Sequence, residues 1–215
     1  MIVLMADAAD KEPVAQLNLT DAVGGPLGML ETSVPAVAFV VAYTASGSDT
    51  NIAAGVAVGL ALVLTVVRLV RHESPQHALS GLIGVGYAAF IATRSGKAEN
   101  FFLPGLLANA AYASAFLISL AVRWPLVGVI VTKIDGEEAG WRQDPQRMRA
   151  FVLASWLWAG LFLLRLVVQL PLYLAGAVVA LGVAKTAMGL PLFGLGLWLT
   201  WLLVRRHRVP ATAPT

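Results

Sequence analysis

Two basic side chains stand inside long apolar segments of this chain, where a charge is costly unless it finds a partner, water or a lipid headgroup. Arg165 and the amide Gln169 lie within Phe151–Tyr173, and Lys185 lies within Ala177–Val204. Neither of these two segments contains an Asp or Glu. The sequence therefore predicts two membrane-embedded cations without an acidic companion, and the chemistry open to them is the binding of anions.

Helical geometry brings the two cations to a similar depth. Counted from a cytoplasmic boundary near residue 150, Arg165 lies about 22 Å along its helix, in the outer third of a ~30 Å hydrocarbon core. Lys185 comes to about 10 Å below the outer boundary. Three interpretations stay open: the side chains extend outward to lipid phosphates, they hydrogen-bond to carbonyls and tyrosines, or they line a hydrated pocket.

Such a pocket would bind an anion, a lipid phosphate or an isoprenoid-phosphate headgroup, because cationic side chains form charge-assisted hydrogen bonds to phosphate. Its candidate residues are the polar groups predicted to lie within the spans: Arg165, Gln169, Lys185, Asn109 and Tyr112.

The sequence lacks the motifs that are typical of common catalytic sites. It has no cysteine and three histidines, and no Walker, HExxH or G-x-S-x-G motif. The carboxylates Asp135, Glu137 and Glu138 cluster in a polar stretch and are interpreted as a solvated loop. We therefore expect no catalytic residue, no metal site and no cofactor, and a protein that is not an enzyme.

Composition indicates an integral membrane protein. Apolar residues make up 58% of the 215 residues, charged residues 13%, and the mean hydropathy is +0.77. A soluble domain usually carries about 25% charged residues. The net charge of +3 is too small to indicate a nucleic-acid partner.

The elements that must position the polar residues are six apolar segments near bilayer length, so the predicted fold is an all-α membrane bundle. Residues 1–25 are expected to form a mobile tail, residues 26–206 a six-helix domain with a cytoplasmic loop at 123–149, and residues 207–215 a C-terminal tail. The six segments are Met29–Ala45, Ile52–Val70, Pro75–Thr93, Phe101–Val122, Phe151–Tyr173 and Ala177–Val204.

Local signals mark several boundaries. Ser46–Asn51 reads as a tight polar turn, and Ser74-Pro75 and Asp144-Pro145 read as helix starts with a capping side chain followed by proline. The sixth segment is too long for one straight span, and Gly189-Leu-Pro191 predicts a kink or break. The rival interpretation has five spans, with Leu172–Met188 lying at the outer surface.

Two further patterns concern association with lipid and with other helices. Gly55 and Gly59 have the GxxxG spacing, and Ala53, Ala57 and Ala61 form a parallel row, which suits close helix packing. Within the loop, Trp124–Val131 is predicted to lie along the headgroups. Small-residue rows of this kind also predict a homo-oligomer.

Orientation follows from the excess of Lys and Arg in cytoplasmic loops. If both termini are cytoplasmic, eleven of the fifteen Lys and Arg residues lie on that side, and only Arg94 and Lys97 lie on the other. We therefore expect a multi-pass protein of the bacterial plasma membrane with both termini inside.

Several stretches resemble an uncharacterised family of integral membrane proteins from high-GC Gram-positive bacteria. They cover most of the region from Gly25 to Arg206, and examples are VPAVAFVVAY at Val34–Tyr43, RWPLVGVIV at Arg123–Val131 and ASWLWAGLFLLRLVVQLPLYL at Ala154–Leu174. This resemblance implies a polytopic membrane protein and names no functional residue.

The order of features is more distantly similar to the intracellular septation protein A family. The matching residues are Pro35, Phe39, Tyr43, Pro125-Leu126, Trp158, Phe162 and Lys185. Arg165 departs from the small neutral residue usual in that family, and Gln169 stands where it has Asn. The resemblance implies a membrane protein linked to cell division, septation and envelope integrity, without catalytic residues.

Two functions follow as hypotheses. The favoured one is a non-enzymatic protein that organises envelope or cell-division membrane proteins by association, with membrane lipids as its surroundings. The alternative is a small transporter or channel that binds an anion or lipid phosphate at the intramembrane site.

Overall fold

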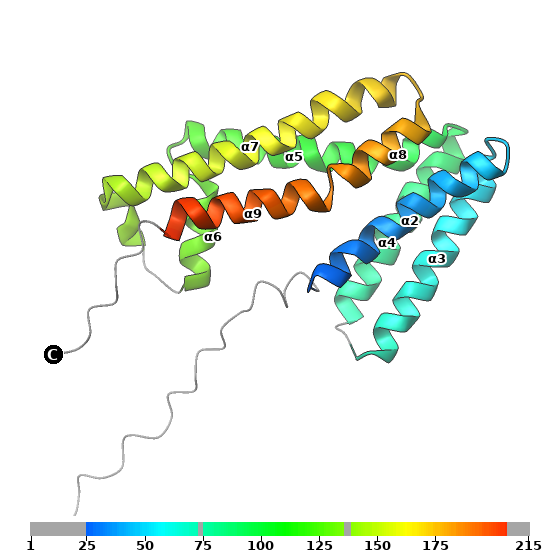
Figure 1. The fold of residues 1–215 in the computed structure, drawn as a ribbon, viewed down its shortest axis with the longest axis horizontal. Helices are drawn as coiled ribbons and strands as arrows, with labels where there is room; N and C mark the ends of the chain where they lie inside the picture. The colour runs from blue at the N-terminus through cyan, green and yellow to red at the C-terminus, as the bar shows by residue number, and fades with distance from the viewer. Residues whose placement is uncertain (1–24, 73–74, 136–138, 206–215) are drawn as a thin grey trace, which may run out of the picture.

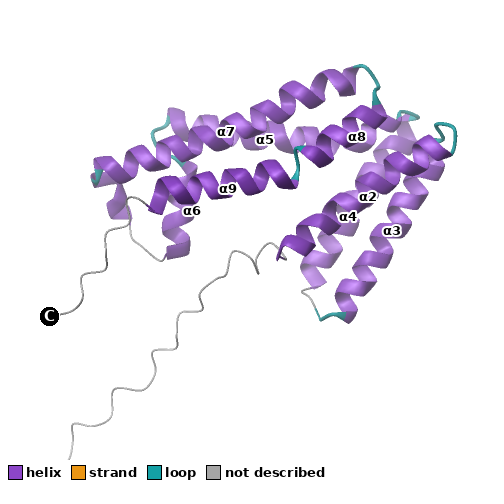
Figure 2. Ribbon diagram, in the orientation of Figure 1, coloured by secondary structure: helices purple, strands orange, loops and turns teal. Residues whose placement is uncertain are grey.

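The computed structural model describes residues 25–72, 75–135 and 139–205, and these form helices and turns only (Figure 2). This confirms the all-α fold. The predicted tails, and Ser74 as the cap of the third segment, lie largely or wholly outside the described residues. The α-helices are α2 (Gly25–Ala45), α3 (Thr50–Val70), α4 (Pro75–Ser95), α5 (Leu103–Ala121), α6 (Leu126–Asp135), α7 (Pro145–Leu174), α8 (Val178–Ala187) and α9 (Leu190–Arg205), and the 3₁₀ helices are η1 (Ala98–Phe102) and η2 (Ala139–Gln143).

The helices form two units that diverge from a common corner (Figure 1). In the first unit, α3 packs between α2 and α4. In the second, α7 packs against α5, α6 and α9. Helix α8 contacts both α2 and α7, and η1 contacts α4, α5 and α8. The corner is therefore built from α8 and η1, which join units that are otherwise separate.

An aromatic cluster holds this corner together. Phe39 of α2 stacks on Phe101 of η1 with ring centroids 4.0 Å apart, and Phe102 meets Phe39 edge-on at 6.0 Å. Phe39, Phe102 and Leu181 are almost fully buried, together with alanines of α3 and α4. The buried rings therefore form the core of this junction.

A second aromatic cluster fills the other unit. Phe116 of α5 and Trp158 of α7 lie with ring centroids 6.4 Å apart, and Phe162 lies within 6.0 Å of both rings. Trp158 Nε1 also donates a hydrogen bond to Thr200 Oγ1 of α9 at 3.0 Å. The polar edge of the indole thus finds a partner inside the protein, as a buried Trp requires.

The two small-residue rows of α3 differ in burial. Ala53, Ala57 and Ala61 are buried against neighbouring helices, as predicted for a close-packed row. Gly55 and Gly59 are exposed, and a Cβ built on either would have no atom within 4 Å. Among the described residues, no other helix packs on this glycine pair.

Two predicted boundaries are confirmed in atomic detail. Asp144 Oδ1 accepts hydrogen bonds from the backbone N–H groups of Gln146 (2.8 Å) and Arg147 (3.3 Å), and Pro145 opens α7. The Ser46–Asn51 turn contains Gly47 and Ser48 at φ 71° and 74°, and Asp49 caps α3. Capping side chains satisfy amide donors that the first helical turn leaves free.

The sixth segment is broken where predicted. Helix α8 ends at Ala187 and α9 begins at Leu190, with Met188 and Gly189 between them. The stretch Leu172–Met188, a surface helix in the five-span interpretation, contains the end of α7, a turn and α8.

Among the described residues, four stretches are long and apolar enough to cross a membrane by length and composition: Thr50–Val70, Ala98–Ala121, Pro145–Leu174 and Val178–Val204. Ser33–Ala45 is a shorter apolar helix. This supports a membrane protein, whereas the count of six spans and the side on which the termini lie stay predictions.

The predicted interfacial segment forms α6. Its N-terminal amides meet side chains of two other helices: Leu126 N donates to Ser119 Oγ at 3.2 Å and Val127 N donates to Ser155 Oγ at 3.3 Å. Gly128 faces Trp141 and Phe151, with no room for a Cβ between them. Helix α6 is thus fixed on α7 rather than merely resting on a lipid surface.

Candidate functional site

Lys185 lies on α8 at the corner where the two helical units meet. Its Nζ lies 5.3 Å from the centroid of the Phe102 ring and 3.6 Å from the position that a Cβ at Gly105 would occupy. Within the described part of the chain, no hydrogen bond or ion pair is made by this ammonium. Its only marked contacts are therefore an aromatic face and a glycine that leaves it room.

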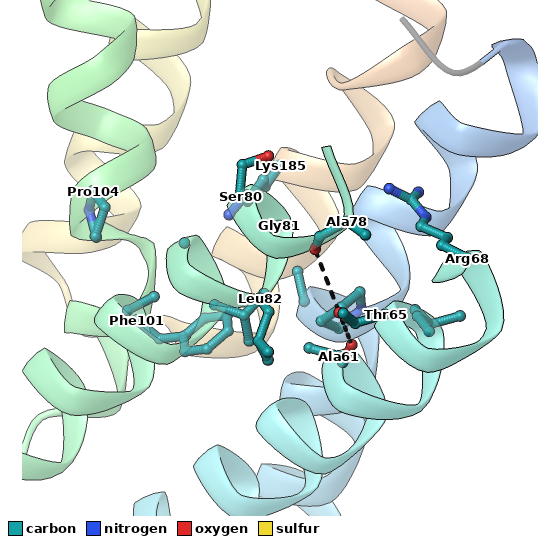
Figure 3. A pocket seen from close by; sticks show the side chains of 16 residues that line it. Ala61, Thr65, Arg68, Ala78, Ser80, Gly81, Leu82, Phe101, Pro104 and Lys185 are labelled. Carbon is teal, nitrogen blue, oxygen red and sulfur yellow. Dashed lines mark hydrogen bonds between the residues drawn. The ribbon is translucent and has the colours of Figure 1, made fainter. Parts of the chain in front are cut away.

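A cavity of about 240 Å³ opens beside this lysine (Figure 3). All three helices of the first unit, η1, the start of α5 and α8 contribute to its wall. Most lining residues are small or apolar, including Pro35, Ala61 and Phe101. Three polar side chains besides Lys185 also reach it: Thr65, Arg68 and Ser80. The cavity is therefore an apolar chamber with cationic groups at separate points of its wall.

The hydroxyl of Thr65 is already used inside the protein. It donates to the carbonyl oxygen of Ala61 at 2.8 Å and lies 3.4 Å from the carbonyl oxygen of Ala78, which ties α3 to α4. Arg68 and Lys185 each lie two residues before the end of their helices, α3 and α8. Both charges are therefore near helix ends, and they reach the cavity from different helices.

Arg165 belongs to a different place in the fold. Its Nη2 donates a hydrogen bond to the carbonyl oxygen of Gly189 at 2.8 Å, at the break between α8 and α9. Its guanidinium carbon lies 6.0 Å from the Phe162 ring centroid, and its Nε has no partner among the described residues. The Gly189 carbonyl oxygen also accepts from the backbone N–H of Phe193 at 3.1 Å, so Arg165 adds a second donor at this break. The sequence leaves three interpretations open for the two cations: contact with lipid phosphates, internal hydrogen bonding, or a hydrated pocket. Arg165 makes an internal hydrogen bond.

The remaining candidates are dispersed over α5 and α7. Gln169 is buried, with 4% of its surface exposed, and Asn109 is half-buried. Tyr112 is 55% exposed, and its ring lies 5.2 Å from that of Phe162. Of the five residues singled out from the sequence, only Lys185 lines the cavity.

Sequence reasoning missed most of the chamber, although one signal was present. Ala61, Thr65 and Arg68 follow the i, i+4, i+7 spacing of one helix face, and they continue the buried alanine row of α3. Gly105, which makes room for Lys185, is preceded by Pro104 of the cavity wall. Nothing in the sequence indicates that these residues face α8, because that contact depends on how the two units meet.

A short polar chain joins the units on the other side of the corner. Tyr173 Oη donates to Asn100 Oδ1 at 2.6 Å, and Asn100 Nδ2 donates to Ser95 Oγ at 2.8 Å. These bonds connect the end of α7, η1 and the end of α4. The corner is therefore held by aromatic packing and by hydrogen bonds, with the cavity on its inner side.

Fold and site together define a class: a membrane protein whose described residues form two helical units, with an open, mostly apolar cavity beside Lys185 where the units meet. The chain belongs to the family described as "Protein of unknown function (DUF3159)", which matches residues 23–211. A search of curated proteins and a search of solved structures each found no match.

Proposed function

We propose that this is a non-enzymatic, multi-pass protein of the bacterial plasma membrane that binds an anionic ligand at Lys185, in the chamber between its two helical units. The observation that supports this most strongly is the Lys185 ammonium beside the cavity without an acceptor in the described structure. An ionised group in apolar surroundings is costly, and an anion in the cavity would offset that cost.

The groups around Lys185 offset little of the cost of placing its charge in apolar surroundings. An ammonium over an aromatic face gains about 0.5–2 kcal/mol, and the 5.3 Å distance to Phe102 is near the outer limit of such contacts. A cavity of about 240 Å³ has the volume of about eight waters. It therefore suits a phosphate or carboxylate group with a small apolar part, from a transported solute or a lipid.

Substitution of Lys185 tests the proposal. Lys185→Met keeps an unbranched stem and removes the charge, and Lys97→Met is the matched control, because Lys97 lies in the exposed loop before η1. We expect inorganic phosphate and phosphatidic acid, tested separately on the full chain in detergent, to raise the melting temperature of the wild type and of Lys97→Met. Lys185→Met should show at least tenfold weaker binding.

The two probes separate the sources of the anion. Stabilisation by phosphatidic acid alone indicates a lipid, and stabilisation by inorganic phosphate indicates a solute. If Lys185→Met binds both probes with wild-type affinity, the proposal is wrong. A lipid-phosphatase and transferase screen on the purified protein tests its non-enzymatic part, and turnover that depends on the chain would contradict that part.

A second candidate function is association with an envelope or cell-division membrane protein, and the bare glycine pair on α3 favours it. Gly55 and Gly59 present an open, close-approach surface, flanked by exposed Ile52, Val56 and Val63. Small-xxx-small faces bind a partner helix through van der Waals packing. The expected partner is a transmembrane helix with a small-residue face of its own. A role in septation is part of this proposal and rests on the sequence resemblance.

The matched variants are Gly55→Leu and Gly160→Leu. Both glycines are exposed with open space around them, but Gly160 lies on α7 outside the GxxxG pair. We expect Gly55→Leu to lose envelope proteins that co-purify with the wild type in mild detergent, and Gly160→Leu to retain them. A change in molecular mass alone would indicate self-association instead. Equal recovery of partners by both variants would contradict the proposal.

A further inference from the structure

An open groove of about 440 Å³ lies between the end of α5 and the beginning of α7, in the second helical unit. Its apolar walls include Leu117 and Leu120 from α5 and Val152 and Trp156 from α7, and Arg123 stands at its end. No residue of the Lys185 chamber takes part. The groove therefore supports an inference that does not depend on the proposed function.

The groove is charged at one end and apolar at the other. Leu117 lies six residues before Arg123 and so about 9 Å along the helix direction. Met148 and Trp156, at the two ends of the α7 side, span about 12 Å. Because α5 and α7 run in opposite directions, Arg123 and Met148 mark the same end, and Leu117 and Trp156 mark the apolar end.

The charged end has residues that are typical of a membrane–water interface. Trp124 follows Arg123, is 45% exposed, and has the Arg142 guanidinium carbon 4.0 Å above its ring. Tryptophan is enriched at headgroup level, where its ring is apolar on one side and hydrated on the other. Arg147 and Arg149 in the first turns of α7 add positive charge at this end.

Arg123 occupies a backbone position that favours glycine. Its φ is 55°, in the left-handed region, where an L side chain is strained. Arg123 N donates to Leu120 O at 3.1 Å and Trp124 N donates to Ser119 O at 2.8 Å, which is the Schellman arrangement at the end of α5. Backbone strain at a charged residue suggests that the side chain has a use of its own.

We propose that this groove binds an anionic phospholipid, with the phosphate on Arg123 and an acyl chain along Leu117, Leu120, Val152 and Trp156. The guanidinium presents paired donors that match phosphate oxygens, and it is not engaged by a carboxylate in the described structure. The order of charge followed by apolar wall is the order of headgroup and chain in a phospholipid. The surrounding arginines favour a lipid with net negative charge.

Because the backbone at Arg123 is strained, a substitution there can separate lipid binding from stability of the fold. Arg123→Gly removes the charge and relieves the backbone, so it should melt at the same or a higher temperature than the wild type in lipid-free detergent. Arg123→Lys keeps the charge and the strain. In mixed micelles, phosphatidylglycerol should raise the melting temperature of the wild type and of Arg123→Lys more than phosphatidylcholine does. In Arg123→Gly that difference should vanish.

Native mass spectrometry of the same three proteins provides a direct readout, with retained phosphatidylglycerol expected on the wild type and lost in Arg123→Gly. The inference is overturned if Arg123→Gly keeps the phosphatidylglycerol-specific stabilisation, or if phosphatidylcholine stabilises the wild type equally. Glycerol phosphate, which has no acyl chain, should have no effect, and stabilisation equal to that of the lipid would also overturn it. Lower stability of Arg123→Gly in lipid-free detergent would show that Arg123 serves the fold, and would count against a lipid site.

Discussion

Arg165 of α7 donates a hydrogen bond to the carbonyl oxygen of Gly189 at 2.8 Å, which is one helical turn beyond Lys185. A Cβ built on Gly189 would lie 3.0 Å from the carbonyl oxygen of Lys185, so the chain is tightly folded at this point. Arg165 and Lys185 therefore have different surroundings. Arg165 stabilises the break between α8 and α9, and Lys185, on the helix before the break, is left to face the cavity.

Replacement of Arg165 by Met should destabilise the protein. The substitution removes a charge-assisted hydrogen bond, which contributes about 1.5–3 kcal/mol, and leaves the Gly189 carbonyl without this donor. Thermal unfolding in detergent measures the loss, with Arg94→Met as the control on an exposed arginine. Binding of anions by the folded Arg165→Met fraction should weaken less than in Lys185→Met. Equal loss in both variants would show that Arg165 belongs to the ligand site.

At Gly182, α8 packs closely against Val40 of α2. A Cβ there would collide with Val40 Cγ2 of α2 and lie 3.5 Å from Phe102. Gly182→Ala should therefore lower stability by about 1–3 kcal/mol, the usual cost of overpacking. Val40→Ala in the same chain should restore part of the loss by removing the colliding methyl groups. Gly160→Ala, in open space, should have little effect in the same unfolding assay.

At Gly128, α6 packs closely against Trp141 of η2 and Phe151 of α7. A Cβ there would lie 2.9 Å from Trp141 Cη2 and 3.0 Å from Phe151 Cδ2, and neither ring is a flexible chain end. We expect Gly128→Ala to loosen α6 from α7 and to expose the 123–144 stretch to protease before the rest of the protein unfolds. Limited proteolysis followed by mass spectrometry detects this, and unchanged cleavage would mean that the rings move aside at little cost.

The hydrogen bond from Tyr173 to Asn100 holds the corner from the side opposite the cavity. Tyr173→Phe removes the hydroxyl and should cost about 0.5–1.5 kcal/mol, the net contribution of a typical hydrogen bond. Tyr87→Phe is the control, because Tyr87 is 59% exposed on α4. A double-mutant cycle with Asn100→Ala would assign the loss to this pair, since independent effects would simply add.

Local sequence signals predicted much of the secondary structure for reasons that apply within a few residues. Asp144 followed by Pro145 specifies a helix start because the carboxylate reaches amides two and three residues away. The break near Gly189 and Pro191 follows from the missing backbone donor of proline and its clash with the preceding turn. The alanine row of α3 is buried because small side chains permit close approach.

The candidate site was harder to predict, since membership of a cavity depends on which helices meet. Arg165 and Gln169 lie about one helical turn apart on α7, and neither residue lines the chamber. Lys185 reaches the chamber because α8 packs between α2 and η1. Arg68 in the last turn of α3 also contributes to the wall of the chamber, although no sequence pattern links it to Lys185.

The amino-acid sequence by itself determined an apolar, all-helical chain with two cations in segments that lack carboxylates, because composition, periodicity and capping act locally. Only the tertiary structure decided what each cation does. The Gly189 carbonyl accepts from Arg165 because the break between α8 and α9 lies beside α7, and the ammonium of Lys185 faces a cavity because two helical units meet at α8. Both outcomes depend on contacts between residues far apart in the chain, which no short pattern encodes.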